Sequence, residues 1–254
     1  MSAAHGSLCL VPNTLDLGTA DAGASLQEVL PLGVIRDAAQ LTHWVAENAK
    51  SARAFLKRVD TVVPLAQPLQ ALSIVELPRP PKGRAQAAPV DLAPLLTPAL
   101  QGHDIGLISE AGLPAVADPG AALVQAAHGL GLRVVAWPGP SSLLLALAAS
   151  GLNGQSFAFV GYLPVNDAER AARIRELESL SRRSGQTQLM IETPYRNAAL
   201  LAALLAHLQG TTRLSVSCGL TLAAGFTRTD SVARWKAAAS ELPPDVPAVF
   251  SLLA

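Results

Sequence analysis

Residues 105–140 constrain the fold of this chain more than any other stretch. They predict a buried strand at 104–109, a helix, and a second strand at 133–137, with turns rich in Gly and Pro between them. Where parallel strands end in such turns, backbone amides and carbonyls stay exposed at one edge of the sheet, and open α/β sheets bind ligands there. We therefore expect a ligand site in this stretch.

Strands alternate with helices along the rest of the chain. Strand patterns cover residues 7–12, 41–46, 70–77, 157–161, 188–192, 213–218, 227–231 and 248–253. Helical patterns cover residues 31–39, 49–59, 90–101, 141–150, 168–181, 197–208 and 232–241. Residues 13–30 are expected to form a loop with a helical turn, and the Pro-rich stretch 78–89 is expected to be an exposed loop. This alternation predicts the α/β class, with mostly parallel sheets of which the second is mixed.

Gly and Asn at residues 151–155 indicate a domain junction. We expect an N-terminal α/β domain at 1–151 and a C-terminal α/β domain at 156–254. A chain of 254 residues is long enough for two such domains. The 50% hydrophobic content suggests that a second copy covers some apolar surface, so a homodimer is expected.

The charge balance excludes one simple class of function. Nineteen basic residues match nineteen acidic ones, so the chain lacks the overall positive field of proteins that bind nucleic acid mainly through phosphates. The overall charge balance does not exclude a local basic patch. The helix at 168–181 could provide one, but its mixed signs are more typical of a solvated face.

Several kinds of chemistry have no support in the sequence. Cys9 and Cys218 lie far apart without a metal-binding spacing, so neither metal binding nor redox chemistry is expected. No Walker A motif, Rossmann fingerprint or nucleophile elbow is present. No signal peptide or membrane span is recognised, so a cytoplasmic protein is expected. A site of loops without a nucleophile suits a reaction whose electrophile comes from a cofactor, such as methyl transfer from S-adenosylmethionine.

The central stretch carries a family signature. Residues 108–120, Ile-Ser-Glu-Ala-Gly-Leu-Pro-Ala-Val-Ala-Asp-Pro-Gly, resemble the Ser-Asp-Ala-Gly-Thr-Pro…Ser-Asp-Pro-Gly signature of the tetrapyrrole-methylase-like (class III) methyltransferases. The likeness continues in order through residues 138–142, 149–152, 159–164 and 192–196. It is closest to the branch that methylates a cytidine ribose 2′-hydroxyl in small-subunit ribosomal RNA.

The resemblance implies two α/β domains, usually in a homodimer, with S-adenosylmethionine in the cleft between the domains. Carried over to this chain, it implies cofactor contacts in the turn after the strand at 104–109, in the loop at 138–142 and in the second domain. These residues are Ser109, Glu110, Ala111, Gly112, Leu113, Pro114, Asp118, Pro138, Ser141, Ser142, Tyr162, Ile191 and Thr193.

The substrate side departs from the family pattern. The ribosomal RNA branch has Glu-Asp-Thr-Arg where this chain has Glu47-Asn48-Ala49-Lys50. Because a neutral ribose hydroxyl is a poor nucleophile, methylation would need a general base, and the candidates are Glu47 and Glu192. The candidate substrate contacts are Asn13, Lys50 and Arg196.

Three functions follow from these observations. The leading hypothesis is an S-adenosylmethionine-dependent methyltransferase acting on an RNA ribose 2′-hydroxyl. The second is a relative that binds the cofactor and transfers no methyl group. The third is a methylase of a tetrapyrrole or another small molecule.

Overall fold

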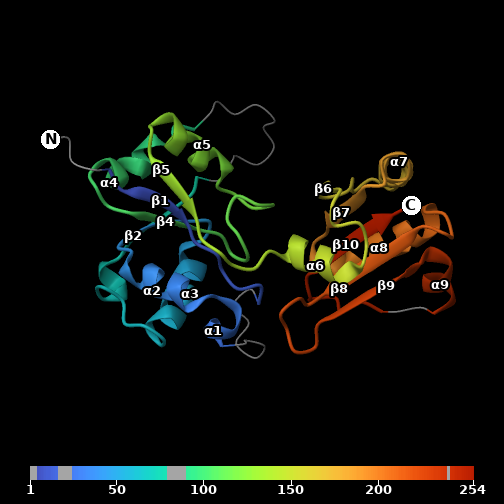
Figure 1. Cartoon of the computed structure of the whole chain (residues 1–254), viewed down its shortest axis with the longest axis horizontal. Coiled ribbons are helices and arrows are strands. Elements are labelled where there is room, and N and C mark those ends of the chain that lie inside the picture. The colour runs from blue at the N-terminus through green and yellow to red at the C-terminus, as the bar shows by residue number, and fades with distance from the viewer. Residues whose placement is uncertain (1–4, 17–24, 79–89, 239–240) are drawn as a thin grey trace. The chain divides into compact units, whose positions relative to one another are not determined.

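The computed structural model describes residues 5–16, 25–78, 90–238 and 241–254. The chain forms two compact units, Met1–Pro140 and Ser141–Ala254 (Figure 1). The division falls one helix before the junction expected at residues 151–155. Helix α6 (Ser142–Ser150) accounts for the difference, because it packs on strands of the second unit.

The first unit is built on a five-stranded sheet in the order β3-β2-β4-β1-β5. Its strands are β1 (Ser7–Leu10), β2 (His43–Ala46), β3 (Ser73–Glu76), β4 (Ile105–Ile108) and β5 (Arg133–Ala136). Every pairing in this sheet is parallel. The central strand β4 is buried along its whole length, as expected for a parallel strand covered on both faces.

Two helix layers cover this sheet (Figure 1). Helices α1 (Leu26–Val29), α2 (Leu32–Gln40) and α3 (Ala49–Asp60) bury a cluster around Trp44 and Phe55 on one face. The 3₁₀ turn η2 (Ala93–Leu96) and helices α4 (Thr97–Leu100) and α5 (Ala121–Gly129) cover the other face. A short 3₁₀ turn, η1 (Leu69–Ala71), precedes β3.

Local sequence explains where these helices begin and break. Helix α3 starts after Asn48, whose side chain accepts hydrogen bonds from Lys50 N and Ser51 N. The helix expected at residues 90–101 is divided into η2 and α4. Pro94 and Pro98 explain the break, because each lacks the N–H that a continuous helix needs. Of the loop expected at 78–89, residues 79–89 lie outside the described part of the chain.

The second unit contains a mixed five-stranded sheet in the order β6-β7-β10-β8-β9. Its strands are β6 (Phe157–Phe159), β7 (Thr187–Ile191), β8 (Arg213–Cys218), β9 (Phe226–Ser231) and β10 (Ala248–Leu253). Only the β6–β7 pair is parallel among these neighbours. The predicted α/β class, with a second sheet of mixed direction, is therefore confirmed.

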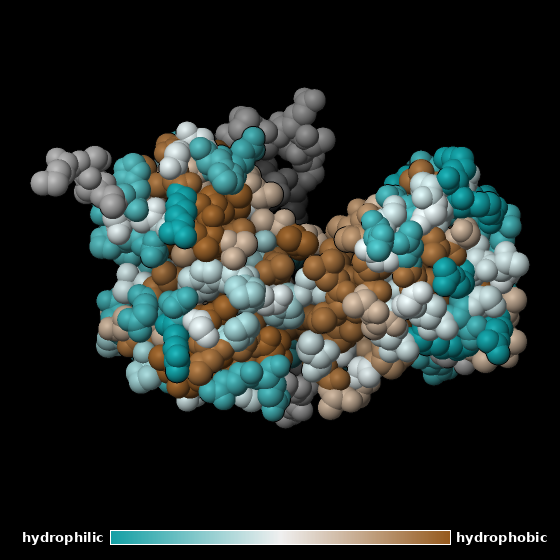
Figure 2. Space-filling view, in the orientation of Figure 1, coloured by the Kyte–Doolittle hydropathy of each residue, from teal (hydrophilic) through white to brown (hydrophobic). Residues whose placement is uncertain are grey.

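The two faces of this sheet differ in their cover. Helices α7 (Asp167–Ser184), α8 (Asn197–His207) and α9 (Val232–Ala237) pack on one face around Trp235 and Phe250, and the 3₁₀ turn η3 (Pro194–Arg196) leads into α8. Helix α6 packs on the other face. Figure 2 shows hydrophobic surface over α6, where Leu144 and Leu145 are exposed. Across the residues described, no helix combines the length and apolar character needed to cross a bilayer.

Gly106 on β4 allows a test of this packing. A Cβ there would lie 2.7 Å from two ring carbons of Trp44, whereas a Cβ on Gly33 in α2 would have no neighbour within 4 Å. We expect Gly106→Ala to destabilise the first unit by about 1–3 kcal/mol through overpacking. Gly33→Ala, the matched control, should stabilise it by up to about 1 kcal/mol through helix propensity. Urea unfolding followed by circular dichroism measures both, and equal stabilities would contradict the packing described here.

Candidate functional site

The chain order of the first sheet places its switch point between β1 and β4. From β1 the chain moves to β2 and β3 on one side, and from β4 it crosses back to β5 on the other side of β1. Ligands of open parallel sheets bind at such a point, outside the carboxyl ends of the strands. The loops that follow β1, β2, β4 and β5 all start at this edge.

Asn13 joins the loop after β1 to the turn after β4. Its backbone N donates to Gly112 O at 2.8 Å, and Gly112 N donates to Asn13 O at 3.2 Å. Its side-chain Nδ2 donates to Ser109 O at 3.1 Å and to Glu110 O at 3.0 Å. Both amide hydrogens are thus used inside the protein, so Asn13 positions the turn. A substrate contact through this amide would require breaking these bonds.

Two glycines let the loops approach closely. A Cβ on Gly139 would lie 2.2 Å from Pro12 Cβ, so only glycine fits between the loops after β5 and β1. Gly112 has a φ of 68°, in the left-handed region, and a Cβ there would come within 3.5 Å of Pro140 O. The family motifs at 109–114 and 138–140 therefore lie together at the carboxyl edge of the first sheet.

The predicted residues around these glycines complete the same edge. Pro114 is buried and Ala111 and Leu113 are half-buried, while Pro138 is exposed. Ala115 and Ala117 have φ values of 65° and 62°, which non-glycine residues adopt at a cost of about 1–3 kcal/mol. Such strained residues cluster at binding sites in folded proteins.

Carboxylates gather beside this turn. Glu47 Oε2 accepts a hydrogen bond from Glu110 N at 3.1 Å, and Glu110 Oε1 accepts one from Ser51 Oγ at 2.9 Å. Burial raises the pKa of the Asp118 carboxyl to about 6. A hydrogen bond with Ser109 opposes this rise in pKa, and the negative charges of Glu47 and Glu110 add to it. Asp118 therefore takes up a proton as the pH falls through about 6.

A cavity of about 510 Å³ opens next to this cluster. It is lined by Asn13, Thr14, Asn48, Lys50, Ser51, Ala54, Phe55, Arg58 and Glu110. Lys50 is exposed at the first turn of α3. The structure thus brings Lys50 together with Asn13 and Glu110 in the lining of one cavity.

The remaining predicted residues form a separate group in the second unit. Glu192 Oε1 accepts from Arg196 Nη2 at 2.6 Å and from Arg196 Nε at 3.0 Å. The same oxygen accepts from Thr193 N at 2.7 Å. The Glu192 side chain is only 6% exposed. This arrangement joins the end of β7 to the start of α8.

Tyr162 and Ile191 lie beside that ion pair. Ile191 N donates to Gly161 O at 3.3 Å, which brings the end of β7 next to the residue before Tyr162. Tyr162 is 54% exposed, while Ile191 is half-buried against α6. Ser141 is the buried N-cap residue of α6, and Ser142 is its first residue.

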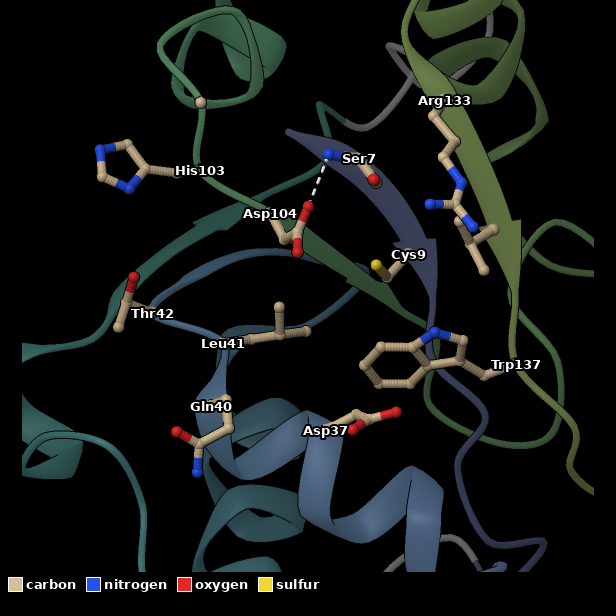
Figure 3. Close-up of a pocket in the computed structure, with 12 residues that line it drawn as sticks. Ser7, Cys9, Asp37, Gln40, Leu41, Thr42, His103, Asp104, Arg133 and Trp137 are labelled. Atoms are coloured by element: carbon tan, nitrogen blue, oxygen red, sulfur yellow. Dashed lines mark hydrogen bonds between the residues drawn. The ribbon is translucent and has the colours of Figure 1, made fainter. Parts of the chain in front are cut away.

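A different cavity, of about 460 Å³, lies near the opposite edge of the first sheet (Figure 3). Ser7 and Arg133 are the first residues of β1 and β5, and Asp104 accepts a hydrogen bond from Ser7 N at 2.6 Å. Burial raises the pKa of the Cys9 thiol in this cavity to about 11, with a further contribution from Asp104. Cys9 is therefore a neutral thiol at physiological pH and a poor nucleophile.

Comparison with known proteins decides the family. The family model described as Tetrapyrrole (Corrin/Porphyrin) Methylases matches residues 38–232. The chain belongs to the tetrapyrrole methylase family. This match confirms the resemblance identified from the central stretch, and it includes both of its Gly/Pro motifs.

Curated relatives of this chain match about half of it. Ribosomal RNA small subunit methyltransferase I of Mesorhizobium japonicum is 41% identical over 132 residues, which cover 52% of this chain and 44% of the relative. The protein of the same name from Bacillus subtilis is 38% identical over 120 residues, covering 47% of this chain and 39% of the relative. The chain thus spans less than half the length of these relatives.

Solved structures share the fold over almost the whole chain. Uroporphyrin-III-C-methyltransferase of Thermus thermophilus has a TM-score of 0.51 at 19% identity, covering 98% of this chain and 92% of that one. The methyltransferase CobJ has a TM-score of 0.56 at 16% identity, covering 98% and 94%. At this level of identity the likeness concerns the fold.

Sequence reasoning missed part of the cluster at the first sheet edge. Arg58 Nη1 lies 3.0 Å from Asp16 Oδ2 and donates to Thr14 Oγ1 at 3.0 Å, holding the loop after β1 against α3. Ser51, which binds Glu110, was missed as well. The position of Arg58 on the predicted helix is visible in the sequence. Its partners Asp16 and Thr14 are not, because they lie 42 and 44 residues away in the sequence. Within the described residues, no group of three potential metal ligands occurs.

The pKa of Asp118 predicts a pH-dependent stability. Its folded-state pKa of about 6 lies above the usual 3.8, so folding favours the protonated carboxyl. The stabilising effect is complete below about pH 4 and is lost as the pH rises through 6. Asp118→Asn should therefore stabilise the protein at pH 7.5 by on the order of 1 kcal/mol, allowing for partial exposure, and leave it unchanged at pH 4. Urea unfolding at both pH values measures this, and a pH-independent effect would refute it.

Proposed function

We propose that this chain is an S-adenosylmethionine-dependent methyltransferase that methylates a ribose 2′-hydroxyl in RNA. The observation that carries the proposal is the retained pair of loops, 109–114 and 138–140, joined at the switch point of the first sheet through Asn13, Gly112 and Gly139. Family membership supports methyl transfer. The names of the curated relatives support RNA as the acceptor.

The residues at this edge suit the cofactor. Closely packed glycines leave backbone amides and carbonyls, which can bind the amino-acid and ribose groups of S-adenosylmethionine without bulky side chains. We assign these contacts to the turn from Ser109 to Pro114, with Asp118 and Pro138. Ser141, Ser142, Tyr162, Ile191 and Thr193 are the proposed contacts of the second unit. When bound, the sulfonium supplies a methyl group that is already activated, so the chain has to orient the acceptor and remove its proton.

The two candidate bases differ in their surroundings. The Oε1 of Glu192 already binds Arg196 and Thr193, so this carboxylate serves the structure of the β7–α8 connection. Glu47 receives one hydrogen bond from Glu110 N and lies near Asp118, which titrates near neutral pH. We therefore assign the general base to Glu47 in preference to Glu192. A base in this position would typically accelerate the reaction by about 10²–10⁴-fold.

A labelled-methyl assay tests the proposed reaction. The protein is incubated with S-adenosylmethionine carrying a tritiated methyl group and with cell extract separated into RNA, protein and small molecules. We expect label in RNA that survives alkaline hydrolysis as dinucleotides, because alkaline cleavage requires a free 2′-hydroxyl. Label in small molecules would instead support the tetrapyrrole or small-molecule methylase. Calorimetric binding of S-adenosylmethionine without any transfer would support the inactive relative, and no binding would refute all three.

Paired substitutions test the assignment of the base. Glu47→Gln keeps an acceptor for Glu110 N but cannot take up the proton, so kcat should fall about 10²-fold or more while cofactor affinity stays unchanged. Glu192→Gln should instead lower the stability by about 1–3 kcal/mol through its weakened bonds to Arg196. Single-turnover rates and thermal unfolding separate the two effects. A Glu47→Gln enzyme with the wild-type rate would contradict the assignment.

A further inference from the structure

Helix α3 carries a stripe of cations beside the candidate site. Lys50, Arg53 and Lys57 follow one another at intervals of three and four residues, so they share one face of the helix. All three side chains are exposed. The helix lies in the outer layer of the first unit, with α2 (Figure 1). Its twelve residues hold four basic side chains and a single acid, Asp60.

These cations are not explained by ion pairing. In the part of the chain that the structure describes, Lys50, Arg53 and Lys57 form no salt bridge. The nearby acids have other partners: Asp60 Oδ1 accepts from Leu65 N, and Glu76 Oε1 accepts from Ala49 N. Glu110 accepts from Ser51. None of these acids pairs with a cation of the stripe, so within the described residues its three positive charges have no ionic partner.

Helix stability explains only one end of the stripe, because Lys57 lies in the last turn of α3, where the helix dipole favours a cation. The helix dipole favours acids in the first turn and bases in the last. Helix α7 follows this rule, with Asp167 and Glu169 first and Arg182 and Arg183 last. Helix α3 has no acid in its first turn and places Lys50 there. A cation at this position costs helix stability, so its presence points to a contact outside the helix.

We propose that Lys50, Arg53 and Lys57 on helix α3 form a binding site for the phosphodiester backbone of a single RNA strand. This site rests on the proposed function and specifies how its substrate is held. The stripe from Lys50 to Lys57 is about 10 Å long, which corresponds to about three phosphates of a stacked strand at about 3.4 Å each.

The cavity next to the stripe connects these contacts to the chemistry. Lys50 belongs to both, because it also lines the cavity with Ser51, Asn13 and Glu110. A strand held along α3 therefore enters the site at the helix N-terminus, beside the turn that follows β4. The stripe contacts phosphates, so it would hold the strand independently of its base sequence.

The test compares two triple variants with the same net charge. Lys50→Gln with Arg53→Gln and Lys57→Gln removes the stripe, and Arg173→Gln with Arg175→Gln and Arg183→Gln removes three exposed or half-exposed cations from α7 as the control. Arg173 Nη1 lies 2.7 Å from Glu176 Oε2, so the α7 cations belong to a surface that carries charges of both signs. Binding of a fluorescein-labelled single-stranded oligoribonucleotide is measured by anisotropy from low to high salt.

We expect the α3 variant to bind the oligoribonucleotide at least about tenfold more weakly at low salt. Its salt slope, d log K/d log[salt], should become smaller in magnitude by about 2, because each lost phosphate contact contributes about 0.7. The α7 control should match the wild type. Unchanged Tm and unchanged calorimetric affinity for S-adenosylmethionine in both variants show that neither the fold nor the cofactor site has been altered.

The outcomes separate this inference from the proposed function. If both variants lost the same amount of RNA affinity, or if the salt slope of the α3 variant were unchanged, the stripe would not be the RNA-binding site. The proposal of RNA methylation would still hold. Failure of the wild type to bind any oligoribonucleotide, with intact cofactor binding, would overturn both the stripe and the RNA acceptor. Binding of the wild type to phosphatidylserine vesicles, lost in the α3 variant, without RNA binding would assign the stripe to a membrane surface and overturn the proposal.

Discussion

The hydrogen-bonded contact between Asn13 and the turn at 109–114 connects the central features of the first unit. Parallel strands β1 and β4 end side by side because their register is set by backbone pairing. Their loops would diverge without a cross-link, and the four hydrogen bonds of Asn13 with Gly112, Ser109 and Glu110 supply it. These bonds hold the exposed backbone of the turn in one conformation. A site that acts by orienting its ligand needs such a fixed backbone.

Several charged groups depend on that clamped turn. Glu110 N reaches the Glu47 carboxylate because the turn holds it there, and Ser51 on α3 binds the Glu110 side chain. Asp118 follows on a strained loop where burial and neighbouring carboxylates favour its protonated form. Acidic groups thus line the strand ends, while the exposed surface of α3 is basic. This separation of charge is consistent with the proposed RNA acceptor, a polyanion whose 2′-hydroxyl would lose its proton near a carboxylate.

The departures from the family pattern have structural explanations here. Asn48, which stands where the ribosomal RNA branch has Asp, caps α3 through its neutral side chain. Lys50 replaces an arginine of the branch, and it keeps a cation at the mouth of the cavity. Lys presents a single point charge, so a bidentate contact of the arginine type is lost.

The sequence alone determined the order of helices and strands, the α/β class and the family, because periodicity, proline and glycine act locally and the motifs at 108–120 and 138–142 are contiguous. It also predicted which loops lie at the carboxyl edge of the first sheet, while the assignment of individual site residues stays a prediction. Tertiary structure decided which of those residues have free functional groups. Asn13 was expected to contact the substrate, but its side-chain amide binds Ser109 O, 96 residues away in the sequence. Glu192 was expected to accept a proton, but its carboxylate forms an ion pair with Arg196. The pKa of Asp118 and the isolation of the α3 cations likewise depend on burial and on neighbours distant in sequence, which no local pattern records.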